Sequence, residues 1–265
     1  MGSMTSWIDR IFYPNHERNW DDSLLRERIA ARLTHHGVVL DLGAGAGIIS
    51  TMDFRAFGAR ICGIDLDPRV LKNPFIHEAR IADILSIPYP DSCFDLVFCN
   101  NVLEHVAEPE KAFAEVLRVL KPGGVFLFKT PNKWHYVPLI ARVTPHFFHR
   151  YFNRKRGRAD EDTFPTLYRA NSRGVIRRVA AGAGFDVEAL ELIEGRPEYL
   201  RVHPLAYVIG LGYERLVNRF QFLAGQRVII IGTLRKHRIP DRPRATNRRN
   251  EEEARTCTQA RCARD

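Results

Sequence analysis

The sequence has few features of secreted, membrane-spanning or metal-binding proteins. Its five cysteines are scattered without a CxxC pair, which favours neither a zinc site nor a disulfide framework. No apolar stretch approaches the roughly 20 residues of a membrane span, and charges at Asp9, Arg10, Glu17 and Arg18 leave no apolar core for a signal peptide. Internal repeats are absent as well. We therefore expect a cytoplasmic protein.

The positive charge is concentrated near the end of the chain. The formal net charge is +9, and residues 235–265 hold ten Lys and Arg against five Asp and Glu, which is +5 and leaves +4 for residues 1–234. The charge alone therefore does not predict a nucleic-acid partner. Residues 239–265 also lack apolar periodicity, which predicts a disordered basic tail. With 45% hydrophobic residues in the whole chain, residues 1–238 are expected to form one domain.

One stretch, residues 38–50, dominates the sequence. An apolar run ends in Asp41 and is followed by three alternating glycines, Gly43, Gly45 and Gly47. This pattern predicts a buried strand, a tight turn and the start of a helix over residues 48–57. Glycine suits such a turn because it adopts positive φ and lets a ligand lie against the backbone. We therefore expect a nucleoside-bearing ligand here.

The spacing of the glycines distinguishes between nucleoside ligands. The dinucleotide pattern G-x-G-x-x-G would need a third glycine where Ile48 stands. Asp41 would repel a pyrophosphate but suits the ammonium of an amino acid. The segment resembles the first motif of class I S-adenosylmethionine-dependent methyltransferases, whose cofactor carries an ammonium and no phosphate.

Two further strands end in acidic residues that suit the same ligand. Residues 60–65 form a short apolar run closed by Asp65, about twenty residues after the glycines, where a carboxylate can bind ribose hydroxyls. A third strand is predicted over residues 76–82. The resemblance implies that Asp83, which follows this strand, accepts a hydrogen bond from the adenine amino group. A solvated loop aspartate is the alternative for Asp83. An amphipathic helix over residues 20–34 is expected to flank or cover the site.

The predicted fourth strand, residues 94–100, is nearly all apolar, as a strand buried on both faces should be. A helix from Pro109, a stop at residues 121–124 and a fifth strand over residues 125–129 follow. This region is similar to the branch that includes ubiquinone- and menaquinone-biosynthesis methyltransferases, and the resemblance covers residues 36–132. It implies an α/β, Rossmann-like sheet of seven strands whose last strand, residues 227–234, runs antiparallel.

The resemblance also implies the cofactor and its site. We expect S-adenosyl-L-methionine to be bound by the following residues: Asp41, Gly43, Ala44, Gly45, Gly47, Asp65, Leu66, Asp83, Ile84 and Asn100. The reacting groups of open α/β sheets lie beyond the carboxyl ends of the strands, so His105 after strand four is the candidate general base and Glu104 the group that fixes its ring. A histidine hydrogen-bonded to the backbone at a helix start is the alternative for His105.

Beyond residue 132 the chain departs from this core. Residues 133–170 and 197–224 are expected to form helical cap insertions, separated by a helix over residues 171–182 capped by Asn171 and a strand over residues 185–193. A basic cluster within residues 150–158 is compatible with a phosphorylated substrate, an anionic membrane surface or simply a solvated loop.

These observations predict methyl transfer to a small-molecule or lipid- or sugar-linked acceptor, most simply O-methylation of a hydroxyl. A non-catalytic cofactor-binding protein that acts through its basic cap and tail is the alternative, and an NAD-linked oxidoreductase is disfavoured by Ile48. Nucleic-acid methylation is disfavoured because strand four lacks an Asn/Asp-Pro-Pro-aromatic signature. Some relatives carry a metal-binding Glu-x-x-Glu-His, but Asn101 replaces the first Glu here, so no metal is expected. The oligomeric state stays open.

Overall fold

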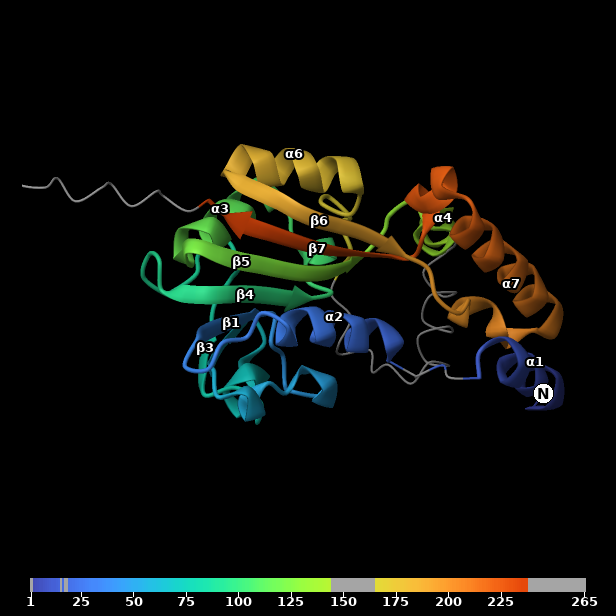
Figure 1. Ribbon diagram of the computed structural model, residues 1–265, viewed down its shortest axis with the longest axis horizontal. Helices are drawn as coiled ribbons and strands as arrows, with labels where there is room; N and C mark the ends of the chain where they lie inside the picture. Colours follow the sequence, from blue (N-terminus) through green and yellow to red (C-terminus); the bar gives the residue numbers. More distant parts are fainter. Residues whose placement is uncertain (1, 15, 17–18, 144–164, 238–265) are drawn as a thin grey trace, which may run out of the picture.

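The computed structural model describes residues 2–14, 16, 19–143 and 165–237 (Figure 1). Its centre is a seven-stranded sheet in the order β3-β2-β1-β4-β5-β7-β6. The strands are β1 (Val38–Leu42), β2 (Arg60–Asp65), β3 (Glu78–Ile81), β4 (Phe94–Asn100), β5 (Leu120–Pro131), β6 (Phe185–Ile193) and β7 (Ile229–Lys236).

The sheet has the predicted mixed topology. β1 pairs in parallel with β2 and β4, β2 with β3, and β4 with β5, whereas β7 runs antiparallel to both β5 and β6. The Rossmann-like fold class and the antiparallel last strand are therefore confirmed. β6 runs in the direction of β5, so the carboxyl ends of all six other strands lie at the same edge.

Helices cover both faces of the sheet (Figure 1). α3 (Pro109–Val119) and α6 (Arg173–Ala183) lie on one face, and α2 (Trp20–Ala30) lies on the other. β4 shows why the sequence produces this: Val97 and Cys99 pack with α3 and α6, while Leu96 and Phe98 pack with α2. Alternate side chains of a strand point to opposite faces, so a continuous apolar run fills two cores.

A helical cap lies beyond the carboxyl edge of the sheet (Figure 1). It contains α1 (Gly2–Phe12), α4 (Tyr136–Val143), α7 (Pro204–Arg219) and the 3-10 helices η6 (Glu198–Val202) and η7 (Gln221–Gln226). Helical structure occurs in both predicted cap insertions, whereas α1 was not predicted. The basic cluster within residues 150–158 and the tail over residues 239–265 lie outside the described residues. None of the helices in the described part of the chain is long and apolar enough to cross a membrane.

The predicted helix over residues 48–57 is wrong. The chain forms only two 3-10 turns there, η1 (Ser50–Met52) and η2 (Arg55–Phe57). Two causes are visible. The segment begins with β-branched Ile48 and Ile49, which are weak helix formers. In addition, the Asp53 side chain accepts a hydrogen bond from the backbone N–H of Arg55 at 3.1 Å, which competes with helical hydrogen bonding.

The predicted ends of α6 are also wrong. Ser172, rather than Asn171, precedes the helix, and the helix ends at Gly184 (φ 98°) instead of Gly182. Asn171 is fully buried, and its side-chain amide donates to Thr130 Oγ1 at 2.6 Å. An asparagine before a helix therefore joins two distant segments here rather than capping its own helix.

Candidate cofactor and active site

The three glycines after β1 form the loop that the sequence predicts. Gly43, Gly45 and Gly47 have φ values of 74°, 52° and 72°, all in the left-handed region. A Cβ atom at Gly43 would lie 2.4 Å from a methyl carbon of Val102. At Gly45 the nearest atom would be 3.9 Å away, in the side chain of Asp65. The backbone is therefore closely packed behind Gly43 and open in front of Gly45, where a ligand can approach it.

Asp65 lies at the end of β2 and faces this loop. Its Oδ2 accepts a hydrogen bond from the Gly45 N–H at 2.8 Å, and its Oδ1 accepts one from the Asp67 N–H at 2.8 Å. These bonds fix the orientation of the carboxylate, and each oxygen keeps a further lone pair. The geometry suits acceptance of two neighbouring ribose hydroxyls. Leu66, the next residue, is exposed beside it.

Asp41 is a buried carboxyl at the base of the same loop. Burial, followed by the charge of Asp65, raises the pKa of Asp41 to about 8. Desolvation and a neighbouring like charge both disfavour the ionised form. A cation placed against Asp41 would reverse both effects, so the pair of carboxyls suits the ammonium of an amino acid.

Asn100 ends β4 beside this pair. Its side-chain amide N–H donates to Asp22 Oδ1 at 2.8 Å, while its Oδ1 is buried and has no hydrogen-bond partner among the described residues. A buried amide oxygen without a partner is costly. The position therefore suits a ligand that donates a hydrogen bond.

A buried lysine attaches α2 to this edge of the sheet. Lys129, near the end of β5, is fully buried, and its Nζ lies 2.6 Å from both Asp21 Oδ2 and Asp22 Oδ1. These contacts hold the start of α2 over the ends of β4 and β5, consistent with the expectation that this helix flanks the site. Sequence reasoning missed Lys129, although a lysine that closes an otherwise apolar strand is a usable signal.

Glu104 and His105 lie in η4 (Leu103–His105), directly after β4. Glu104 is buried, which raises its pKa, and its Oε2 accepts from Thr130 Oγ1 at 3.0 Å. His105 Nδ1 is 2.9 Å from the Pro165 carbonyl oxygen. A carbonyl only accepts, so Nδ1 carries the proton and Nε2 is the basic nitrogen of the neutral ring. Pro165 therefore orients the Nδ1 side of this ring, and a role of Glu104 in fixing the ring stays a prediction.

Asp83 and Ile84 follow β3 at the same edge. Asp83 Oδ1 accepts from the Leu85 N–H at 2.9 Å, which fixes a local turn, and Ile84 packs against the core. In the sheet order β1 and β2 separate β3 from β4. Asp83 therefore lies on the side of the glycine loop away from His105, and its contact with adenine stays a prediction.

The residues present fit S-adenosylmethionine. Its ammonium, ribose hydroxyls and adenine amine are all hydrogen-bond donors, and the site offers Asp41, Asp65, Asn100 and Asp83 as acceptors. The Gly45 amide, which could hold a phosphate, already donates to Asp65. This donor and acceptor arrangement argues against a dinucleotide and agrees with the position of Ile48.

Comparison with known proteins gives the same class. Residues 40–128 match the family described as "Methyltransferase domain". The chain is 36% identical over 96 residues to the malonyl-[acyl-carrier protein] O-methyltransferase of Serratia marcescens, which covers 35% of this chain and 37% of that protein. It is 34% identical over 137 residues to the ubiquinone biosynthesis O-methyltransferase of Thiobacillus denitrificans. This match covers 46% of this chain and 55% of that protein. The chain spans between 37% and 62% of the length of the curated relatives compared.

Solved structures support the fold independently. The [4+2]-cyclase SpnF is 21% identical, with a TM-score of 0.55 over 84% of this chain and 85% of that one. At this identity the likeness shows the fold alone, and that protein is named a cyclase. The chain is thus similar, in its fold and over the matched residues, to S-adenosylmethionine-dependent methyltransferases. The match to the methyltransferase-domain family extends over residues 40–128 of the 265 residues.

Proposed function

We propose that the protein transfers a methyl group from S-adenosylmethionine to an oxygen atom of a small-molecule or lipid- or sugar-linked acceptor. The observation that carries the proposal is the set of fixed hydrogen-bond acceptors around the open glycine loop, formed by Asp41, Asp65 and Asn100. The cofactor, when bound, supplies a methyl group already activated on a sulfonium. The similarity to two proteins named O-methyltransferases supports oxygen as the accepting atom.

The residues of this chain would contribute mainly binding, alignment and proton removal. Asp41 would hold the ammonium of the cofactor, and Asp65 would hold its ribose hydroxyls. The buried Lys129 would keep α2 in place over the carboxyl edge of the sheet so that water is excluded. His105 is the proposed general base, because its Nδ1 lies 2.9 Å from the Pro165 carbonyl oxygen, which leaves Nε2 as the ring nitrogen that can take a proton. A hydroxyl acceptor needs such a base.

A methyl-transfer assay tests this function. The protein is incubated with S-adenosylmethionine and a panel of phenols, carboxylic acids, sugars and amines, and S-adenosylhomocysteine is measured. We expect turnover with an oxygen acceptor, and His105→Ala should lower kcat by about 10²- to 10⁴-fold without changing cofactor affinity. His237 is an exposed histidine paired with Asp186. The variant His237→Ala serves as the matched control and should keep full turnover.

Three outcomes would revise the proposal. Binding of S-adenosylmethionine without turnover on any acceptor would favour the alternative, a non-catalytic protein that acts as an interaction module. Unchanged kcat in His105→Ala, with turnover intact, would remove His105 as the base. Loss of turnover on chelation, restored by magnesium, would contradict the metal-independent mechanism expected from Asn101.

A further inference from the structure

Helix α7 is apolar on two opposite faces. Its buried face, which includes Tyr207, Gly210 and Val217, packs within the cap. The opposite face is exposed, and we call it the α7 outer face. It consists of Leu205, Val208, Ile209 and Leu216.

The residues of the α7 outer face form one continuous stripe. They are separated by intervals of three, one and seven residues, which places them on the same side of an α-helix over about three turns. Leu205 and Ile209 are 65% and 64% exposed. In the next segment, η7, Phe222 is 82% exposed. An exposed apolar surface that no described residue covers marks a contact with something beyond the described part of the chain.

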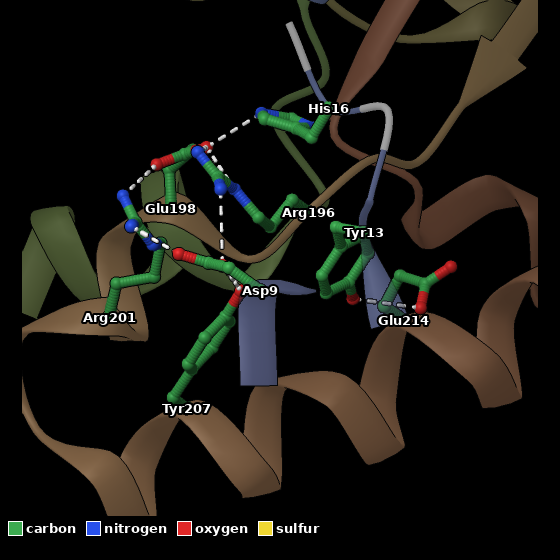
Figure 2. Close-up of polar contacts among 8 residues, drawn as sticks. All are labelled: Asp9, Tyr13, His16, Arg196, Glu198, Arg201, Tyr207 and Glu214. Atoms are coloured by element: carbon green, nitrogen blue, oxygen red, sulfur yellow. Dashed lines mark hydrogen bonds and ion pairs between the residues drawn. The ribbon is translucent and has the colours of Figure 1, made fainter. Parts of the chain in front are cut away.

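Charges around the α7 outer face are sorted by sign. The acidic residues of the two neighbouring helices, Asp9 on α1 and Glu214 on α7, point toward other residues of the cap (Figure 2). Asp9 accepts from Tyr207 and forms ion pairs with Arg196 and Arg201. Glu214 accepts from Tyr13 at 3.1 Å and from Asn218 at 2.7 Å.

The exposed charges on these helices are all basic. On α1 the exposed charged side chain is Arg10, and on α7 these are Arg215 and Arg219. Arg215 is 57% exposed at its side chain although its Nε lies 3.4 Å from Glu214. At 100° per residue, Arg215 lies on one flank of the α7 outer face, and Arg219 lies at its C-terminal end. An apolar stripe bordered by arginines is the pattern of a helix that lies in the surface of an anionic bilayer.

We propose that the α7 outer face docks the protein on the surface of an anionic lipid bilayer. The apolar side chains would enter the boundary between headgroups and acyl chains, while Arg215 and Arg219 contact the lipid phosphates. A second copy of the chain is a poorer occupant, because the exposed charges of its α1 and α7 are basic as well and give these arginines no anionic partner. The proposal does not depend on which acceptor is methylated or on whether methyl transfer occurs.

Vesicle flotation with the full chain tests this docking. The vesicles are made of phosphatidylcholine alone or of phosphatidylcholine with phosphatidylglycerol, and the bound fraction is measured at low and physiological salt. We expect binding to the anionic vesicles that weakens with salt. Leu205→Ser with Ile209→Ser should lower the partition coefficient by about 30- to 100-fold, given the apolar area removed. Arg215→Gln with Arg219→Gln should lower it by about 25-fold.

The matched control is Leu71→Ser in η3 (Pro68–Lys72), which packs beside β2 and β3 and whose Leu71 is 58% exposed. This variant should bind vesicles like the wild type, and circular dichroism should show that all variants are folded. Failure of the wild type to bind anionic vesicles would overturn the proposal. Equal binding by the α7 and Leu71 variants would overturn it too. A concentration-dependent dimer in light scattering that Leu205→Ser with Ile209→Ser abolishes, without vesicle binding, would assign the face to a second copy.

Discussion

Asp41 should couple cofactor binding to the release of a proton. In the free protein, burial and Asp65 raise its pKa to about 8, so the carboxyl is mostly protonated at pH 7. An ammonium placed against it favours the ionised form and lowers that pKa. Binding at pH 7 should therefore release about one proton, and affinity should rise as the pH approaches 8.

The size of the effect follows from the ionised fraction of Asp41. With a pKa of about 8, about 1% of the free protein is ionised at pH 6 and about half at pH 8, so affinity should increase by about 50-fold over this range. Stability of the free protein should change in the opposite direction. The pKa of Asp41 in the folded state lies above its unfolded value near 4, so the folded state binds a proton that the unfolded state has released. The stabilising effect of this proton is lost as the pH rises from about 4 to about 8.

Calorimetry with S-adenosylmethionine at pH 6, 7 and 8, in buffers of different ionisation enthalpy, measures both the affinity and the protons released. The ligand's own titration affects the wild type and Asp41→Asn equally, so it cancels in the ratio of their affinities. This ratio should show the increase with pH that ionisation of Asp41 causes. Asp83→Asn, at the other end of the site, should weaken binding but keep the proton release. A wild-type affinity that does not change with pH relative to Asp41→Asn, with no proton released, would refute the reasoning.

Two further predictions concern stability, measured by urea unfolding. Gly45→Ala should cost about 1–2 kcal/mol because a non-glycine residue enters the left-handed region. Gly43→Ala should cost more, because its Cβ would also lie 2.4 Å from Val102. Equal costs would contradict the close packing behind Gly43. Lys129→Met should cost about 3–5 kcal/mol because it leaves the buried Asp22 and the partly buried Asp21 without their cation. Lys121→Met, which removes a surface pair with Asp95, should cost at most about 1 kcal/mol, and a similar loss in both variants would show that Lys129 is not held in a buried network.

Sequence patterns predicted the strands well because the physical signal is local. The bounds of β2, β4 and β6 agree with the prediction residue for residue, since each is an apolar run closed by polar or turn residues. The glycine loop was predictable for the same reason: three alternating glycines after a buried strand have few uses other than positive φ. The resemblance to a known family then supplied the number of strands and the antiparallel direction of the last one, which no local pattern contains.

The missed features depend on contacts between distant residues. Lys129 and Asp22 are 107 residues apart, so neither residue indicates the other in the sequence. Asn171 was assigned as a helix cap because asparagine favours that position, but its bond to Thr130, 41 residues away, determines its conformation. The incorrect helix over residues 48–57 has a local cause, because apolar spacing does not register the hydrogen bond from Arg55 to Asp53.

The central claim is that the glycine loop and the acidic strand ends form a site for S-adenosylmethionine. Isothermal titration of the full chain with S-adenosylmethionine, S-adenosylhomocysteine and NAD tests it most directly. Both sulfur-containing nucleosides should bind, and Asp65→Ala should weaken them by about 1.5–3 kcal/mol, the scale of hydrogen bonds to a charged group. Tight binding of NAD, with no binding of S-adenosylmethionine, would contradict the account.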